Sequence, residues 1–136
     1  MPKLTRDQAQ KWDAQLKGGF RLDVRHYVLW GEKNAIRNID LEGGKILRAT
    51  LEYHERRKNY TTLPGGVPTL HLAIWTPSGT GGTYCSSGMG ASIPVGDPQP
   101  KKLWSELCRL SGTITEEKIR SLAAEHLEQL KNPFVA

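Results

Sequence analysis

Apolar and polar residues alternate along two long segments of the chain, and this period of two is typical of a half-buried β-strand. In residues 20–30, Phe20, Leu22 and Val24 share one face with Val28 and Trp30. In residues 46–57 the apolar face runs from Leu47 to Tyr53. Weaker alternation predicts two more strands. The four predicted strands are 20–30, 35–41, 46–57 and 69–76, with turns at 31–34 and 42–45 and a Pro- and Gly-rich loop at 63–68.

Helical spacing of apolar residues is confined to the two ends of the chain. Thr5 and Gln8 have the spacing of a capping box, and the Gly pair at 18–19 is a stop signal, so a helix is predicted over 5–17. A short helix is predicted over 101–110. Thr113 and Glu116 again have capping-box spacing, and the following apolar stripe predicts a helix to about Lys131.

The stretch TPSGTGGTYCSSGMGASIPVG (76–96) lacks the three sharp motifs that a Gly- and Ser-rich loop can carry. No Lys lies between Lys58 and Lys101, so there is no phosphate-binding P-loop. A third glycine of a dinucleotide fingerprint and a Gly-x-Ser-x-Gly elbow are also missing. Two short strands, 83–86 and 91–95, joined by a glycine turn are predicted, as either a plain surface hairpin or a recognition loop.

These elements predict an α+β fold. It has a single antiparallel sheet of four to six strands, with an N-terminal helix and two C-terminal helices packed on one face. With 136 residues and neither an internal repeat nor a linker, the chain is predicted to be one domain, 1–136. Its N-terminal helix would span 5–17, its β-rich region 20–95 and its C-terminal helical region 101–131.

Charge and composition narrow the partner class. The net charge is +5, and residues 21–60 carry nine Lys and Arg against six Asp and Glu. A basic excess favours anionic partners. Because there is no long apolar run and there are only two cysteines, we expect a cytoplasmic protein with no membrane contact, present as a monomer or homodimer. We expect no cofactor.

The polar face of the predicted sheet is the first candidate site. It would gather Arg21, Arg25 and Tyr27 with Arg48, His54 and Arg56, and on some registers with His71 and Trp75. Asp23 and Glu52 would sit among the arginines, so a salt-bridged, solvated face is the open alternative. The basic run Arg56-Arg57-Lys58 could grip phosphates or simply protect the sheet edge from aggregation.

The sequence therefore predicts a non-enzymatic protein that binds nucleic acid or a nucleotide through this face and the Gly-rich loop. No residue is assigned a catalytic or metal-binding role. Phosphates would be neutralised by Arg25, Arg48, Arg56, Arg57 and Lys58, next to His54. Bases would stack on Tyr27, Trp75 and Tyr84. Backbone amides near Gly81, Gly82 and Thr83 would approach a phosphate.

Two other functions stay open. A protein-binding inhibitor or adaptor, such as an accessory protein of a mobile element, would use the charge-poor region 61–100 with Tyr84 and Met89. A Cys/His-dependent enzyme, or a metal site, would combine Cys85 with His26, His54 and His71. These residues lack the close spacing that metal motifs show. His126, on the stripe of the last helix, is interpreted as a packing or capping residue.

Overall fold

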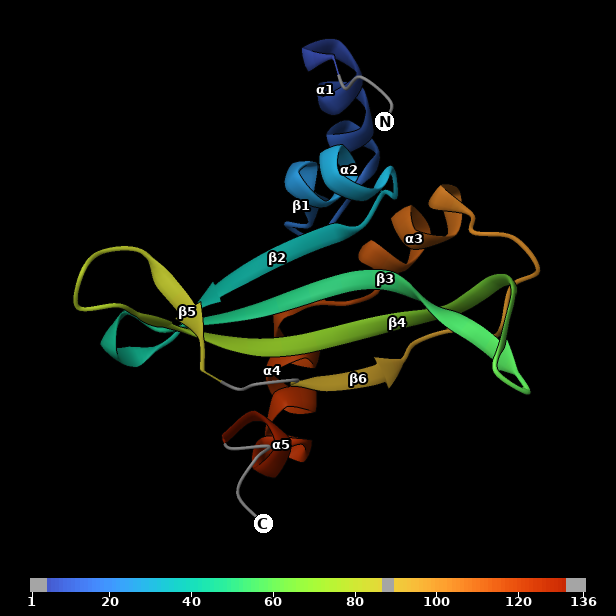
Figure 1. The fold of residues 1–136 in the computed structure, drawn as a ribbon. Coiled ribbons are helices and arrows are strands. Elements are labelled where there is room, and N and C mark those ends of the chain that lie inside the picture. Colours follow the sequence, from blue (N-terminus) through green and yellow to red (C-terminus); the bar gives the residue numbers. More distant parts are fainter. Residues whose placement is uncertain (1–4, 87–89, 132–136) are drawn as a thin grey trace.

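In a computed structural model, which describes residues 5–86 and 90–131, the chain forms one antiparallel sheet of six strands with helices at both ends of the sequence (Figure 1). The predicted α+β class is confirmed. The strands are β1 (Arg21–Leu22), β2 (Ala35–Asp40), β3 (Ile46–Lys58), β4 (Thr61–Pro77), β5 (Thr83–Cys85) and β6 (Ala91–Pro94). The helices are α1 (Arg6–Gln15), α2 (Val24–Trp30), α3 (Trp104–Ser111), α4 (Glu116–Glu125) and α5 (Leu127–Lys131), with a 3₁₀ turn, η1 (Glu42–Gly44), between β2 and β3.

The strand order is β1-β2-β3-β4-β5, and β6 pairs with β4. β5 pairs with residues 75–77 of β4 and β6 with residues 69–72, so the two strands follow one another along β4. The two predicted short strands are confirmed, but they do not form a hairpin with each other. The hairpin instead joins β4 to β5, while Met89 lies outside the described residues.

The predicted strand over 20–30 is wrong: only Arg21 and Leu22 are extended, and α2 follows. The side chain of Asp23 accepts a hydrogen bond from the backbone N–H of His26 (3.1 Å) and so caps the helix. Gly31 ends it in the left-handed conformation (φ 73°). Val24 and Val28 are four residues apart, and this spacing fits one face of a strand as well as one face of a helix. Because the segment has only seven residues, the apolar pattern does not separate the two, and the capping residues decide the structure.

The predicted loop over 63–68 is also wrong, because β4 runs through it. The register between β3 and β4 shifts after Glu55, which pairs with Gly66, whereas Arg56 pairs with Leu63. Two extra residues, Pro64 and Gly65, thus form a bulge, which absorbs the turn-forming residues without ending the strand. β3 and β4 therefore form one long hairpin.

The C-terminal helices differ from prediction in their caps. Thr115, not Thr113, caps α4 by accepting from the backbone N–H of Lys118 (3.2 Å), and the Thr113 hydroxyl donates to the Leu110 carbonyl. The predicted single helix is divided at His126, whose ring lies 2.9 Å from the Leu122 carbonyl. His126 is therefore a capping residue, as predicted.

The core lies between one face of the sheet, the inner face, and the helices α3 and α4. Alternate residues of β3 (Leu47, Ala49 and Leu51) are buried, as the alternation predicted. The core also contains Leu16, Phe20, Ala35, Ile39, Leu70, Leu72, Ala91, Leu107, Cys108, Leu110, Ile114, Ile119 and Leu130. The opposite, outer face carries polar residues and is approached by α2.

Candidate functional site

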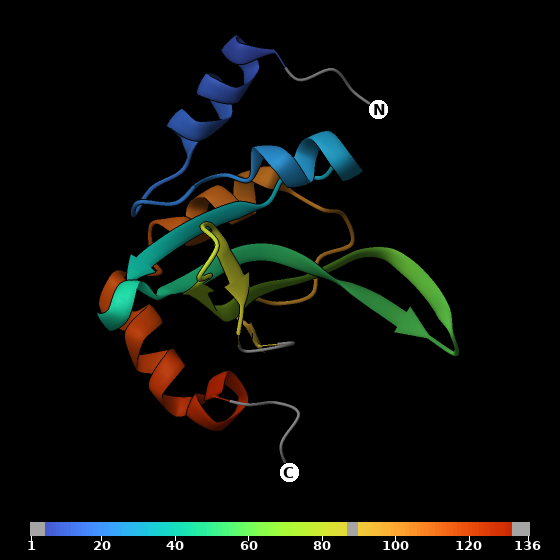
Figure 2. The same cartoon turned by 60° about the vertical axis from the view of Figure 1, so that its left-hand side comes forward.

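The end of the β3–β4 hairpin, residues 56–63, extends away from the core and is called the arm. Figure 2 shows it projecting beyond the other strands and the helices. It carries Arg56, Arg57 and Lys58 on β3, and the residues of β4 that pair with them are uncharged. The predicted basic run therefore lies on a projecting two-stranded ribbon, where β3 pairs with β4 on one side and has no partner strand among the described residues on the other.

The turn at the tip of the arm has an unusual residue. Lys58 pairs with Thr61, which leaves Asn59 and Tyr60 as a two-residue turn with left-handed φ angles of 49° and 66°. Such a turn matches the twist of the strands but favours glycine, and another residue costs about 1 kcal/mol or more. The side chain of Tyr60 is fully exposed (101%), so no packing against residues 5–86 or 90–131 offsets this cost.

The base of the arm is fixed from both sides. Arg56 Nη1 donates to the Pro64 carbonyl across the bulge (3.2 Å). Gly66 exchanges two backbone hydrogen bonds with Gln99 (3.1 and 2.8 Å). Gly65 has φ 81°, and a Cβ there would overlap the backbone of Gln99 and Pro100. Only glycine therefore lets the 96–102 segment brace the arm.

A polar cleft of about 540 Å³ lies between α2 and the outer end of β3. Its charges are largely paired within the chain: Lys102 bonds Glu32 (2.6 Å), and Arg57 bonds Glu55 (3.0 Å). It is lined by His26, Glu32, Asn34, Glu52, Tyr53, His54, Glu55, Arg57 and Lys102. Counted over Lys, Arg and Glu alone, the lining holds two cations and three carboxylates, and this formal net charge of −1 disfavours phosphate in the cleft.

Glu52 and His71 are the two outer-face groups with perturbed acidity. Burial raises the pKa of Glu52, and the nearby charges of His54 and His26 oppose this. Burial lowers the pKa of His71, and His54 adds to that effect. His71 Nδ1 lies 3.0 Å from Ser92 Oγ. His26, which was predicted on a strand, thus lies on α2 near Glu52 and His54 of β3.

Arg48 and Trp75 contact each other on the outer face of the sheet. The guanidinium lies 4.4 Å from the centre of the Trp75 ring and also donates to Asn38 Oδ1 (3.1 Å). The indole Nε1 is buried, with no hydrogen-bond partner among the described residues. This ring was predicted to stack on a base, and in the structure Arg48 lies over it.

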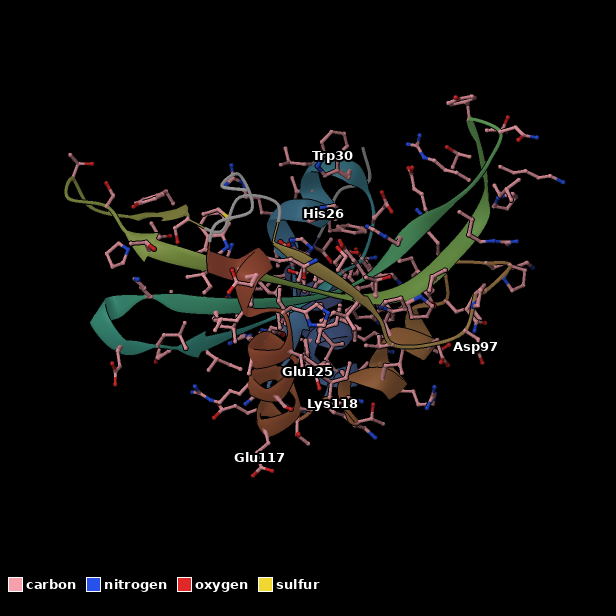
Figure 3. All side chains as sticks on the ribbon, turned by 90° about the horizontal axis from the view of Figure 1, so that it is seen from below. His26, Trp30, Asp97, Glu117, Lys118 and Glu125 are labelled. Carbon is pink, nitrogen blue, oxygen red and sulfur yellow. The ribbon has the colours of Figure 1, made fainter. Side chains whose placement is uncertain are left out.

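Arg25 and Tyr27 lie on α2 and not on a strand, so their predicted place on the sheet face is wrong. The ring of Tyr27 packs edge-on against Trp12 of α1 (5.0 Å between ring centres) and is only half-buried. The exposed residues of α2 are mostly apolar, with Arg25 among them, and Trp30 at its end is 69% exposed. In Figure 3, Trp30 lies at the periphery of the molecule and His26 lies closer to the sheet.

The predicted Gly-rich loop lies far from the arm. Gly81 and Gly82 belong to the turn that joins β4 to β5, closed by a hydrogen bond from the Ser78 N–H to the Gly82 carbonyl. Thr83 and Tyr84 follow on β5. This turn is at the opposite end of β4 from Thr61, roughly 50 Å along the strand. One short ligand therefore cannot contact both predicted sites.

Cys85 is separated from His71 along β4. Cys85 pairs with Trp75, and His71 pairs with Ser92, so the two positions are four residues, or about 13 Å, apart along the strand. Within residues 5–86 and 90–131, no three His, Cys, Asp or Glu side chains are grouped closely enough to hold a metal ion.

Sequence reasoning missed two features of the site. The turn at Asn59 and Tyr60 was not predicted, because the Pro-Gly-Gly segment at 64–66 carried the stronger turn signal, although Asn59 is a residue that hairpin turns favour. The nearness of His26 to Glu52 and His54 was missed because His26 was placed on a strand and not on α2.

Comparisons of the chain with known protein families, with curated proteins and with solved structures found no match. Within the described part of the chain, none of the helices combines the length and the apolar character that crossing a membrane requires.

Proposed function

We propose that this protein binds nucleic acid, with the arm as its main contact. The observation that carries the proposal is the grouping of Arg56, Arg57 and Lys58 with the fully exposed Tyr60 on one projecting hairpin. Cations neutralise phosphates, and an exposed aromatic ring can stack on a base.

The charge balance of the arm supports a polyanionic partner. The arm holds three cations and no carboxylate, and with the adjacent Glu55 included the net charge is +2. The Arg57–Glu55 pair is exposed on both sides (66% and 54%), so it is worth little in water and can exchange for a phosphate. The outer sheet face contributes less, because Arg48 is stacked on Trp75 and the cleft has a net negative charge.

The test is a salt series of binding to single-stranded DNA, duplex DNA and RNA. The arm variant Arg57→Gln/Lys58→Gln leaves Arg56 and its bond to Pro64 in place. The matched control, Lys11→Gln/Lys118→Gln, removes the same charge from α1 and α4, away from the arm (Figures 1 and 3).

We expect log K to fall linearly with log salt, and the arm variant to reduce the slope by about 2. The control variant should leave the slope nearly unchanged. If no nucleic acid binds at low salt, or if both variants weaken binding equally, the proposal is wrong.

A protein partner is the second candidate, and the exposed apolar side of α2 favours it. Val24, Val28 and Leu29 are each more than 40% exposed beside Trp30. The partner that we test here is a second copy of this chain. Sedimentation equilibrium of the wild type and of Trp30→Ser tests this candidate. A dimer that the substitution dissociates supports it, and a monomer at all concentrations refutes self-association through α2.

A further inference from the structure

We infer that the arm enters a groove of duplex DNA, with Tyr60 as the leading side chain that stacks against the bases. This inference rests on the proposed function and adds the class of nucleic acid and the role of one residue. It starts from the turn, where Tyr60 occupies a left-handed position that glycine would fill without strain. Strain that no internal contact offsets indicates a role outside the chain.

The size of the arm matches a DNA groove. The major groove of B-form DNA is about 12 Å wide and admits a two-stranded β-ribbon. From Arg56 to Asn59 the arm extends by three residues, or about 10 Å, and the groove is about 8.5 Å deep. Tyr60 can therefore reach the base edges while the ribbon lies between the two phosphate strands.

The distribution of cations favours a duplex over a single strand. Because side chains alternate along a strand, Arg56 and Lys58 lie on one face of the ribbon and Arg57 on the other. A ribbon with cations on both faces can contact the phosphates on both sides of a groove. A single strand of nucleic acid would contact only one face of the ribbon. It would also meet only one aromatic ring, whereas proteins that bind single strands offer several rings in succession.

The bulge and the brace give the arm a fixed direction. The hydrogen bonds between Gly66 and Gln99 hold its base, and Arg56 closes the bulge on Pro64. The arm therefore does not have to be ordered when it binds, which lowers the entropic cost of inserting Tyr60.

The experiment compares wild type, Tyr60→Gly and Tyr60→Trp, each as the full chain. The probes are a 20-base-pair duplex with 2-aminopurine beside a flexible TA step, one of its single strands, and an RNA duplex of the same sequence. Tyr60→Gly removes the ring but suits the left-handed turn, so the arm keeps its fold, which circular dichroism and the urea midpoint verify. Tyr60→Trp keeps an aromatic ring.

We expect wild type to bind the DNA duplex more tightly than the other two probes and to raise 2-aminopurine fluorescence by unstacking the step. Tyr60→Gly should bind the duplex about 10-fold or more weakly, with an unchanged salt slope and no fluorescence rise. Tyr60→Trp should retain both properties.

The inference is overturned, and the proposed function survives, if Tyr60→Gly binds the DNA duplex as tightly as wild type with a salt-dependent affinity. It is equally overturned if the single strand or the RNA duplex binds more tightly. If wild type binds none of the three probes at low salt, the proposed function and the inference both fail.

Discussion

At the scale of single residues, the outer sheet face holds groups whose acidity depends on folding. His71 is half-buried opposite Ser92, and both its burial and the neighbouring His54 lower its pKa below the ordinary histidine value of 6.5. At pH values between the lowered pKa and 6.5, this histidine is therefore protonated to a larger extent in the unfolded chain than in the folded one. Stability contributed at this residue is therefore present above pH 6.5 and is lost as the pH falls through that window.

We predict that the free energy of unfolding decreases on acidification from pH 7.5 to 5 by a larger amount in wild type than in His71→Asn. The Asn side chain does not titrate and can still bond Ser92 Oγ. Urea titrations at the two pH values measure this difference. Glu52 acts with the opposite sign, since its raised pKa makes stability fall as the pH rises above 4.5, but it is present in both proteins. An NMR midpoint of the His71 ring at or above 6.5 would contradict the prediction.

At the scale of elements, α2 shows why a cap matters more than the pattern of a short segment. Asp23 begins α2 by accepting from His26, and Gly31 ends it. We predict that Asp23→Ala lowers the free energy of unfolding by about 1 kcal/mol, whereas Asp23→Asn, which keeps an acceptor, changes it by a few tenths. Urea unfolding with an unchanged m-value measures both. Equal losses in the two variants would show that the charge of Asp23, and not its cap, holds the helix.

The same element shows how far the sequence predicts this fold. Strand β3 was predictable because its alternation extends over enough residues to exclude a helix, whereas β2 was predicted from weaker alternation between two turn signals. The seven residues of α2 fit the period of a strand and that of a helix, and only the single residues at its two ends decide between them.

The arm was not predicted for another reason: the bulge at Pro64 and Gly65 depends on a backbone contact with Gln99, more than thirty residues away. A contact of that range leaves no local pattern. For the candidate site, the basic run at 56–58 was predictable from its charge, but its projection from the core was not.

At the scale of the whole molecule, one hairpin serves two purposes. Its base supplies Leu51 and Leu70 to the core, where both are fully buried, and its end forms the arm. The arm contacts the rest of the chain through its braced base, so we expect it to add little to global stability.

Replacing one leucine in the core part of this hairpin and one in the arm tests whether the two parts contribute differently to stability. Leu51→Ala removes a side chain enclosed by the sheet and helices, and we predict that it lowers the free energy of unfolding by about 2–5 kcal/mol. Leu63→Ala lies on the arm, half-buried opposite Arg56, and should cost less than about 1 kcal/mol. Native-state hydrogen exchange should agree, with amides at 57–62 exchanging far faster than those at 47–51. A large loss from Leu63→Ala would mean that the arm unfolds with the core, and that changes at the arm cannot be interpreted as effects on binding alone.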